Sequence, residues 1–424
     1  MVAGINRIIG FMRRLQAFKF ELRPDGEQRR RLARFAGCCR FVFNKALALQ
    51  KDSYQTGGQF VGYVAMAKHL TEWRNGTETP WLKQAPVHPL QHALKDLERA
   101  YRNFFEQRAR FPRFKRKGRP ESFRYPDAKQ FKIDQTNSRL FLPKLGWLRY
   151  RNSREILGVP RNITVSESAG RWFASIQTER EVAAPVARSS AAIGIDVGIT
   201  RFATFSDASF LVPLNSFRQH EQRLRRYQRR MSRKVKYSQN WLKAKRRVQK
   251  IHSRIAHVRH DFLHKATTTI SKTHAIVCIE DLKVRNMSRS ARGTAAAPGR
   301  QVKSKSGLNK SILDQGWYEF RRQLEYKLAW NGGELIAVPP HHTSQTCPAC
   351  QHVSGESRPS QALFHCVGCG YEQHADVVGA INILERGLRL SACREEGAGL
   401  ARKRKAKPAS EKQEPTEETH AIAA

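Results

Sequence analysis

The sequence predicts an α+β multidomain fold, in which a small β-barrel with an inserted helical domain is followed by an α/β domain that contains an inserted zinc ribbon. Three observations indicate this fold. Segments with the two-residue apolar period of strands lie on both sides of a long helical stretch. Further along, short apolar runs alternate with long helical patterns, which is typical of an α/β sheet. Two CxxC pairs follow towards the C-terminal end.

The barrel is predicted from strands that are far apart in the chain. Residues 15–22 place apolar side chains at alternate positions. Strand-like pieces return between residues 139 and 178, with Ala169 and Gly170 suited to a hairpin turn. The simplest arrangement is one small β-barrel built from residues 1–24 and 136–185.

Residues 25–135 are expected to form the inserted helical recognition domain. From residue 25 to about residue 48, apolar residues recur every three or four positions, and Gly37 is able to divide the run into two helices. Residues 88–108 carry the apolar stripe of a further helix. After the barrel, the composition of residues 181–190 is that of a linker.

The α/β domain is expected to comprise residues 190–345 and 371–392. Its first strand, IGIDVG, carries Asp196 and is followed by a second apolar run, as in a β-hairpin. A long, basic helical segment spans residues 216–265, and the strand IVCIE then ends at Glu280. Two apolar strands therefore each present a carboxylate.

The last part of this domain contains a predicted loop, helix and strand. Residues 286–310 are rich in Ser, Ala, Gly and Lys, and we expect a mobile loop there. Ser311 or Asp314 is expected to cap the helix that follows, and the run GELIAVPP predicts one more strand. Residues 393–424 are charged and have few large apolar residues, so we expect a disordered tail.

The two CxxC pairs predict a zinc ribbon over residues 346–370. Fifteen residues separate the pairs, and each CxxC turn can present two thiolates to one tetrahedral ion. The four remaining cysteines have no evident pairing pattern, which suits a reducing compartment. The predicted zinc ligands are Cys347, Cys350, Cys366 and Cys369.

The charge balance predicts a polyanionic partner, with nucleic acid favoured. Lys and Arg together number 77 against 36 Asp and Glu, which gives a formal net charge of +41. No apolar run approaches the roughly 20 residues that span a bilayer, and the N-terminus lacks the features of a secretory signal. We expect a cytoplasmic, nucleoid-associated protein with no membrane partner and no small-molecule substrate.

Three carboxylates occupy positions that suit metal-dependent chemistry. Asp196 lies in an apolar strand, Glu280 ends another, and Asp376 opens the helix DVVGAINIL just after the ribbon. Their order fits an RNase H-like sheet, in which the three acids meet at one edge. Such a trio binds two Mg²⁺ ions about 3.5–4 Å apart, which activate water and stabilise the leaving oxygen in phosphodiester cleavage.

Simpler roles exist for individual polar residues. A single Asp before Gly in a strand usually makes a turn or a hydrogen bond, so it is the trio together with the ribbon that favours catalysis. We expect Asp281 to cap or to face solvent, and Asp207 to close a turn. His341, His342 and His374 lie near the ribbon, but four cysteines already complete a tetrahedral zinc site.

The motifs IGIDVG, IVCIEDL and CPAC with CVGCGYEQHADVVGAINI resemble the three RuvC motifs and the zinc ribbon of TnpB, a family of transposon-encoded, RNA-guided DNA endonucleases. The resemblance extends upstream to EQRRRLARFAGCCRFVFNKAL, HPLQHALKDLERAYRNFF and LPKLGWLRYR, and so covers nearly the whole chain to about residue 390. It implies a RuvC nuclease domain in which Asp196, Glu280 and Asp376 bind catalytic Mg²⁺. It also implies that the four ribbon cysteines bind structural Zn²⁺.

The chain departs from the usual family pattern beside the third acid. The family commonly has an acid where His374 stands, an Asn where Val378 stands and a Gly where Gln351 stands. None of these three residues is a predicted metal ligand. His374 and Val378 flank Asp376, however, where a change is able to lower activity.

The resemblance further implies that a guide RNA is bound and pairs with target DNA. Two basic segments are the strongest candidates for nucleic-acid contacts, namely RFPRFKRKGR, where aromatic residues alternate with cations, and the basic helix. The alternative for the cations is a solvated face, and for the two aromatics it is core packing. The predicted contact residues are Phe111, Arg113, Phe114, Lys115, Arg116, Lys117, Arg225, Arg226, Arg229, Arg230, Arg233 and Lys234.

The favoured function is an RNA-guided, Mg²⁺-dependent DNA endonuclease of a transposon, linked to transposition and DNA recombination. A DNA-binding repressor that no longer cuts is one alternative, although such proteins lose one or more of the acids and all three are present here. A strand-joining transposase is another, because three acids on an RNase H-like fold also serve that reaction. The helical insertion and the basic helix fit RNA binding better, by resemblance.

Overall fold

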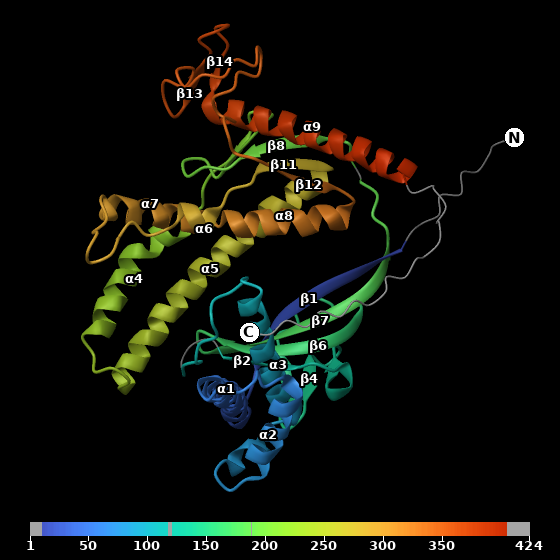
Figure 1. The fold of residues 1–424 in the computed structure, drawn as a ribbon, viewed down its shortest axis with the longest axis vertical. Coiled ribbons are helices and arrows are strands. Elements are labelled where there is room, and N and C mark those ends of the chain that lie inside the picture. The colour runs from blue at the N-terminus through green and yellow to red at the C-terminus, as the bar shows by residue number, and fades with distance from the viewer. Residues whose placement is uncertain (1–10, 118–120, 188, 405–424) are drawn as a thin grey trace, which may run out of the picture. The chain divides into compact units, whose positions relative to one another are not determined.

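The structure, a computed structural model, describes residues 11–117, 121–187 and 189–404, with side chains as far as Cys393. The described chain forms two units. Unit 1 comprises the residues up to Ala184 together with Gln222–Arg254, and unit 2 comprises Pro185–Glu221 and the residues from Ile255 onward. Figure 1 shows the helices and strands of both.

Unit 1 contains an antiparallel sheet of seven strands in the order β2-β6-β7-β1-β5-β4-β3. The outer strands are only three or four residues long. Among the described residues no ladder joins β2 to β3, so the predicted closure into a barrel is not confirmed. The strands are β1 (Phe11–Arg23), β2 (Ser122–Tyr125), β3 (Lys132–Asp134), β4 (Arg139–Leu142), β5 (Gly146–Tyr150), β6 (Val159–Ser168) and β7 (Arg171–Ala183).

The hairpin between β6 and β7 has the predicted turn. Ala169 and Gly170 have φ angles of 53° and 80°, and Ser168 pairs with Arg171 across the turn. Two successive positive φ angles define the type I′ turn that matches the twist of a hairpin. The predicted first strand is also confirmed, and it is longer than expected because β1 pairs with β7 from Phe11 to Leu22.

The helices of unit 1 pack on one another and on β2. α1 begins with a capping box, in which Asp25 accepts a hydrogen bond from the N–H of Gln28 while the Gln28 side chain accepts one from the N–H of Asp25. The predicted break at Gly37 is wrong. Buried neighbours such as Ala36 and Cys38 hold α1 continuous, since packing outweighs the roughly 1 kcal/mol cost of glycine in a helix. The elements are α1 (Gly26–Gln55), α2 (Tyr63–Asn75), η1 (Pro80–Gln84), α3 (Val87–Phe105) and η2 (Ala128–Gln130).

Unit 2 is built around a five-stranded sheet in the order β10-β9-β8-β11-β12. β8, β11 and β12 are parallel, while β9 and β10 are antiparallel to their neighbours. α8 and α9 lie on opposite faces of this sheet (Figure 1). The elements are β8 (Ala192–Asp196), β9 (Ala203–Phe205), β10 (Phe210–Leu211), β11 (Ile276–Glu280), α6 (Val284–Met287), α7 (Val302–Gln315), α8 (Trp317–Asn331), β12 (Glu334–Val338), β13 (Leu363–His365), β14 (Glu372–His374) and α9 (Ala375–Arg404).

The predicted basic helical segment is two helices, α4 (Ser216–Ser232) and α5 (Gln239–Thr273). The prediction that Ser311 or Asp314 caps the next helix is wrong, because both residues lie inside α7 and Gly316 occupies the N-cap position of α8. Asp314 instead accepts hydrogen bonds from Ser216 Oγ and Phe217 N, both at 3.0 Å, and so caps the start of α4 from a distant part of the sequence. No local pattern in the sequence shows that Asp314 caps α4 rather than the helix that follows it.

Two predicted irregular segments are partly helical. The predicted mobile loop contains the end of α6 and the first part of α7. Lys305 Nζ donates a hydrogen bond to Met287 O at 2.7 Å, which ties the two helices together. The prediction of a disordered tail is wrong for residues 393–404, which continue α9. This stretch has no proline, and its Ala, Leu, Arg, Glu and Lys residues outnumber its two glycines. Residues 405–424 lie outside the described part of the chain.

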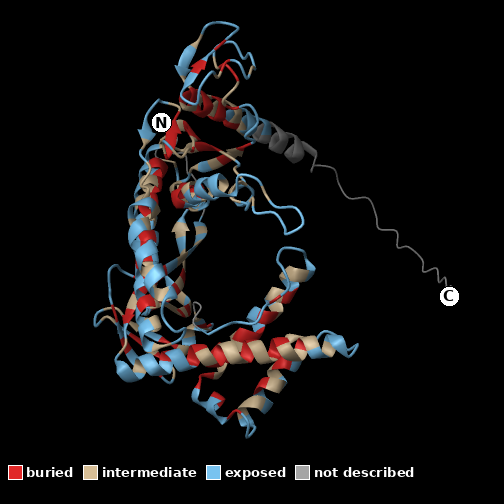
Figure 2. Cartoon of the chain, turned by 90° about the vertical axis from the view of Figure 1, so that its left-hand side faces the viewer, coloured by how far each residue is buried: buried red, intermediate tan, exposed pale blue. Residues whose placement is uncertain are grey.

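Glycine permits the close approach of α9 to β8. A Cβ atom added at Gly194 would lie 2.0 Å from Ala380 O, which no real contact allows. Residues 375–387 of α9 are correspondingly buried or half-buried, whereas residues 388–393 are mostly exposed (Figure 2). The absence of a side chain at Gly194 is therefore a condition for placing this helix on the sheet.

Substitution Gly194→Ala is expected to lower the thermal unfolding midpoint of the protein. Overpacking of a close contact costs about 1–3 kcal/mol, and here the neighbour is backbone that has no free rotamer. Gly307→Ala is the matched control, because Gly307 lies in α7 with open space around it. Calorimetry of both variants makes the comparison, and an unchanged midpoint for Gly194→Ala would contradict the packing argument.

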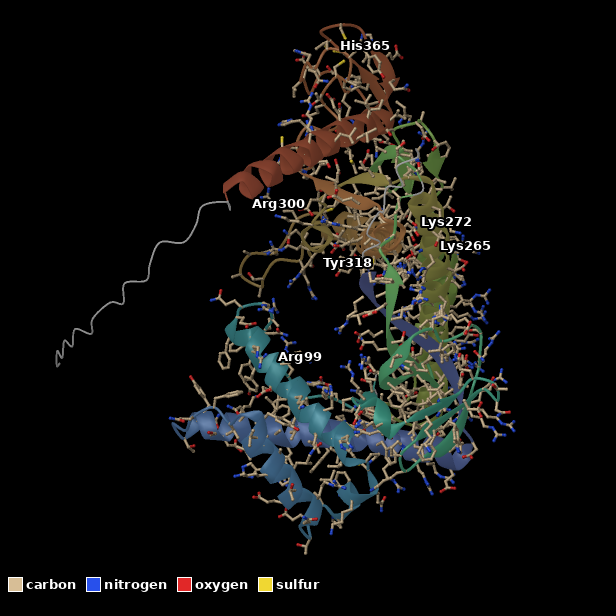
Figure 3. The ribbon with its side chains drawn as sticks, turned by 90° about the vertical axis from the view of Figure 1, so that its right-hand side faces the viewer. Arg99, Lys265, Lys272, Arg300, Tyr318 and His365 are labelled. Carbon is tan, nitrogen blue, oxygen red and sulfur yellow. The ribbon has the colours of Figure 1, made fainter. Side chains whose placement is uncertain are left out.

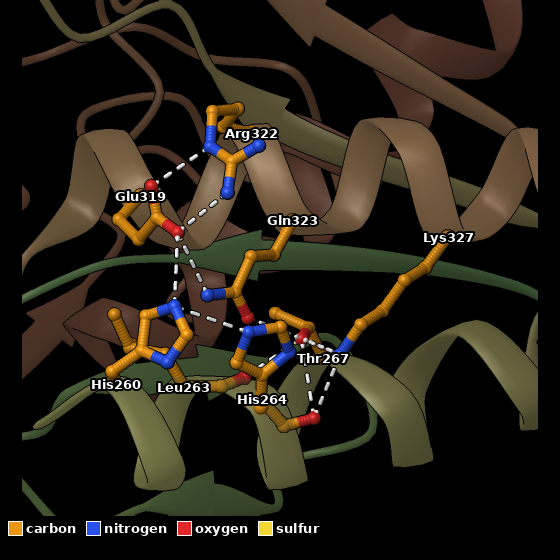
Figure 4. Close-up of polar contacts among 8 residues, drawn as sticks. All are labelled: His260, Leu263, His264, Thr267, Glu319, Arg322, Gln323 and Lys327. Carbon is orange, nitrogen blue, oxygen red and sulfur yellow. Dashed lines mark hydrogen bonds and ion pairs between the residues drawn. The ribbon is translucent and has the colours of Figure 1, made fainter. Parts of the chain in front are cut away.

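A polar network joins α5 to α8 inside unit 2 (Figure 4). Thr267 Oγ1 donates to Gln323 Oε1 at 3.0 Å and accepts from Lys327 Nζ at 2.7 Å. His264 Nε2 lies 3.2 Å from His260 Nε2. Burial, followed by the charges of His260 and Lys327, lowers the pKa of His264 to about 4. The network therefore holds a neutral imidazole between the two helices.

The low pKa of His264 predicts a loss of stability in acid. An unfolded histidine has a pKa near 6.5, so between pH ~6.5 and ~4 the unfolded chain binds a proton that the folded chain excludes. As the pH is lowered through this range, the thermal unfolding midpoint of the wild type should fall more steeply than that of His264→Gln. His342→Gln, at an exposed position, serves as the control and should keep the wild-type slope. Equal slopes for all three proteins would refute this role of His264.

Candidate active site

The parallel pairing of β8 with β11 brings the first two predicted acids together. Ile195 is in register with Ile279, and each strand ends at the next residue, Asp196 and Glu280 respectively. Both strands are apolar and buried because helices cover both faces of the sheet. The two carboxylates therefore leave the same edge of the sheet side by side.

The third predicted acid reaches this edge from α9. Asp376 lies in the first turn of the helix, and α9 contacts both β8 and β11. In the same turn, a Cβ atom added at Gly379 would lie 3.0 Å from Asp196 Oδ2. The structure thus brings Asp196, Glu280 and Asp376 to one place, although they are far apart in the chain.

The electrostatics of the site follow from this convergence. Burial, then repulsion by Glu280 and by Asp376, raises the pKa of Asp196 to about 7. Burial also raises the pKa of Glu280, against a hydrogen bond from Thr343 and the charge of Arg386. Three carboxylates in one partly buried place favour bound cations, because each cation relieves the repulsion.

The donor set suits hard cations. Carboxylate oxygens are the ligands that Mg²⁺ prefers. The cysteine group of the ribbon offers thiolates instead, which suit Zn²⁺. The two sets of residues therefore differ in the metal that they prefer.

Two polar residues that the sequence did not predict support Glu280. Thr343 Oγ1 donates a hydrogen bond to Glu280 Oε1 at 2.6 Å. Asn382 Nδ2 in turn donates to the backbone oxygens of Thr343 and Thr346, both at 2.7 Å. Asn382 is buried in the apolar run DVVGAINIL, and a buried amide in such a run requires partners. That signal was available in the sequence.

Arg358 is a third unpredicted neighbour of the site. Its Nη2 atom lies 4.0 Å from Asp376 Oδ1, and its charge opposes the rise in the pKa of Asp196. Arg358 belongs to the ribbon, between the two CxxC pairs. No local pattern marks it, since only the folding of the ribbon onto α9 brings it to the carboxylates.

The residues that depart from the family pattern have structural roles beside Asp376. His374 Nδ1 accepts a hydrogen bond from the N–H of Asp376 at 3.2 Å. Val378 is buried in a cluster with Cys347, Phe364 and Cys366. The valine side chain therefore joins the ribbon to the first turn of α9.

The four predicted zinc ligands form one compact group. Their sulfur atoms lie within 4.8 Å of one another, and the pairs Cys347–Cys369 and Cys350–Cys366 are each 3.6 Å apart. Tetrahedral zinc with Zn–S bonds of about 2.3 Å requires sulfur atoms about 3.8 Å apart. The arrangement therefore fits one zinc ion. His341 and His342 are exposed, outside this group.

A small cavity adjoins Glu280. It has a volume of about 140 Å³, and its lining includes Trp317, Tyr318 and Arg321 of α8. Asp281 forms an ion pair with Arg321. The side of the site next to Glu280 is thus lined by aromatic and cationic side chains, which suit contact with a nucleic-acid strand.

The predicted nucleic-acid contacts all lie on exposed surface of unit 1. Five of the predicted arginines, four in α4 and Arg233 just after it, line a groove of about 380 Å³ with Gln222. Phe111 and Phe114 are 41% and 46% exposed, so neither is a core residue. In unit 2, exposed lysines such as Lys265 and Lys272 extend from α5 (Figure 3). No described helix is both long and apolar enough to cross a bilayer.

Three family models match parts of the chain. A model described as "Probable transposase" matches residues 175–291, and one described as "Cas12f1-like, TNB domain" matches residues 317–383. A model described as "Helix-turn-helix domain" matches residues 12–59, which form β1 and α1 in the structure. The first two ranges contain all three converging acids and all four ribbon cysteines.

A relative that matches nearly the whole chain shows to which family the chain belongs. The chain is 55% identical to "Putative RNA-guided DNA endonuclease InsQ" of Escherichia coli (strain K12), over 97% of this chain and 100% of the relative. The chain belongs to the TnpB family. Another relative, "Putative RNA-guided DNA endonuclease" of Streptomyces pristinaespiralis, is 36% identical over 96% of this chain and 98% of its own length.

A solved structure shares the fold of this TnpB family member. The structure described as "Cryo-EM structure of the Cas12f1-sgRNA-target DNA complex" has a TM-score of 0.50 and 13% sequence identity, covering 85% of this chain and 83% of that chain. At this identity the similarity concerns the fold alone. It supports the predicted mixed α+β fold with several sheets.

Proposed function

We propose that this chain is an RNA-guided DNA endonuclease of a transposon, which cleaves target DNA at a RuvC-type site with two Mg²⁺ ions. The observation that carries the proposal is the convergence of Asp196, Glu280 and Asp376 at one sheet edge of a chain with a net charge of +41. The names of the full-length relatives support the same activity. The nuclease domain would comprise residues 190–345 and 371–392.

The chain's own residues prepare the site for a phosphodiester. Asp196, Glu280 and Asp376 would hold the Mg²⁺ ions, which supply activation of a water molecule and stabilisation of the leaving oxygen when bound. Thr343 keeps Glu280 oriented through its hydrogen bond. Arg358 adds a positive charge beside Asp376, which favours the approach of a phosphate.

The basic surfaces would hold the guide RNA and the target DNA. Exposed arginines of α4 and cations of residues 111–117 offer charge to phosphate groups. Binding of this kind releases counterions, so affinity should fall steeply as salt rises. The zinc ribbon, residues 346–370, would have a structural role, because it presents Arg358 and packs on the first turn of α9.

The proposal is tested on the full chain purified with its bound RNA. Sequencing of the RNA should give a discrete species whose end matches the flank of the transposon. A duplex DNA that matches this end should be cut when Mg²⁺ is supplied. Random RNA fragments with no cutting would refute the proposal. Target binding without cutting would indicate a repressor, and joining of transposon ends would indicate a transposase.

A further inference from the structure

Unit 1 contains an aromatic cavity that the proposed nuclease chemistry does not use. It has a volume of about 570 Å³ and lies between α1 and α3 and the segments that follow each helix. Cavities of this size typically hold small organic groups. Its aromatic lining, here named the aromatic pocket, consists of Tyr54, Phe60, Tyr101, Phe104, Phe105 and Phe111.

The rings of the aromatic pocket are unusually open to solvent. Phe105, Phe60 and Phe111 are 62%, 45% and 41% exposed. Large apolar side chains that gather on a surface usually mark a binding site. The T-shaped contacts of Phe60 with Tyr101 and Phe105, at 5.4 and 6.0 Å between centroids, hold the rings in fixed orientations. The rings therefore support one another around the pocket.

Polar and cationic groups accompany the rings. Lys51 lines the pocket and places its ammonium group 5.7 Å from the centroid of Phe111 and 4.9 Å from that of Phe114. Gln50 and Gln55 also line it. The hydroxyl of Tyr101 is buried and has no hydrogen-bond partner within the described residues. Such a lining suits a flat group with polar edges that is attached to a negative charge.

An unpaired nucleobase has these properties. Its faces stack on aromatic rings, its edges carry donors and acceptors, and its phosphate is attracted by cations. α3, which supplies three of the pocket's aromatic residues, also carries the exposed cations Arg99 and Arg102, and Figure 3 shows Arg99 on this helix. A second copy of this chain is disfavoured as the occupant, because it carries the same large positive charge.

The base is expected to come from RNA rather than from DNA. Loops and bulges of structured RNA already present unstacked bases, whereas a base of duplex DNA must first be unpaired and unstacked at a cost in free energy. We propose that the aromatic pocket of unit 1 binds an unpaired base of the resident RNA. The inference rests on the proposed function in one respect, because it requires that the protein carries a bound RNA.

The test compares variants of the full chain for binding to single-stranded oligouridine and to duplex DNA, each about 16 nucleotides long, the upper end of common site sizes. Phe105→Ala should weaken binding of the RNA about 5- to 100-fold, since a stacking contact is lost. The slope of affinity against salt should not change, because no phosphate contact is removed. Phe105→Trp should restore the affinity. Phe210→Ala, at an exposed position of unit 2, should leave it unchanged.

Three results would overturn the inference. One is wild-type RNA affinity in Phe105→Ala, and another is an equal or larger loss of affinity for the duplex DNA. The third is a wild-type dimer that Phe105→Ala dissociates. Cleavage of matched DNA by the wild-type complex separates this test from the proposed function. If the wild type cuts and Phe105→Ala binds RNA normally, only the inference fails; if RNA binding is lost but the wild type never cuts, only the function fails.

Discussion

Replacement of Asp196 by alanine is expected to abolish DNA cleavage while the binding of RNA and target DNA is retained. Repulsion by Glu280 and by Asp376 raises the pKa of Asp196, so both other acids lie close enough to act on this residue. Loss of a metal ligand removes several kcal/mol of transition-state stabilisation, and each 1.4 kcal/mol is about tenfold in rate. Single-turnover cleavage of a matched duplex should therefore slow by about a thousandfold or more.

Asp207→Ala is the matched control, because Asp207 lies in the same unit in an exposed turn. It should cleave as the wild type does. Gel-shift measurements on both variants report whether binding persists. Undiminished cutting by Asp196→Ala would exclude this residue from catalysis, and loss of binding in the same variant would point to a folding defect.

The isosteric variant Asp196→Asn separates function from stability. In Mg²⁺-free buffer the folded wild type holds Asp196 with a raised pKa, about 7, while the unfolded chain titrates near its ordinary value. The folded state therefore binds more protons between these values, and wild-type stability should fall as pH rises from ~4 to ~7. The asparagine variant should lack this slope and unfold at a higher temperature at neutral pH.

Loss of zinc is the second change with a large expected effect. The four cysteines fit one tetrahedral ion, and structural zinc contributes about 10–16 kcal/mol of apparent folding free energy in small zinc domains. Elemental analysis should find one zinc ion per chain in the wild type and less than one in Cys347→Ser. The ribbon should then become sensitive to proteases.

The same variant should lose DNA cleavage, although no ribbon cysteine touches the carboxylates. Cys347 and Cys366 pack with Val378 in the first turn of α9, where Asp376 also lies. A loosened ribbon therefore releases the third acid and Arg358 together. Cys393→Ser, at an exposed cysteine outside the ribbon, should retain both zinc and activity. Zinc-free protein that cleaves normally would show that the ribbon does not position Asp376.

Several elements could be predicted because their signals are local. The alternation of apolar residues predicted β1, and the apolar stripe of residues 88–108 predicted α3. The failures have tertiary causes. Gly37 did not break α1 because neighbouring core residues hold the helix, and Asp314 caps α4 because a distant N-terminus lies within its reach.

The sequence by itself determined which residue types are available for chemistry. The spacing of two CxxC pairs specifies four thiolates for one ion, and apolar strands that end in carboxylates specify candidates for a metal site. These patterns are local because each depends on a few neighbouring residues. The joint appearance of the patterns, in this order, also indicated the family.

Only the tertiary structure decided how these residues meet. The register of β8 with β11 sets Asp196 beside Glu280, and the close approach that Gly194 allows brings α9 and Asp376 to the same edge. Arg358 joins them through the fold of the ribbon. Distances between residues far apart in the chain depend on packing and backbone pairing, which no short stretch of sequence encodes.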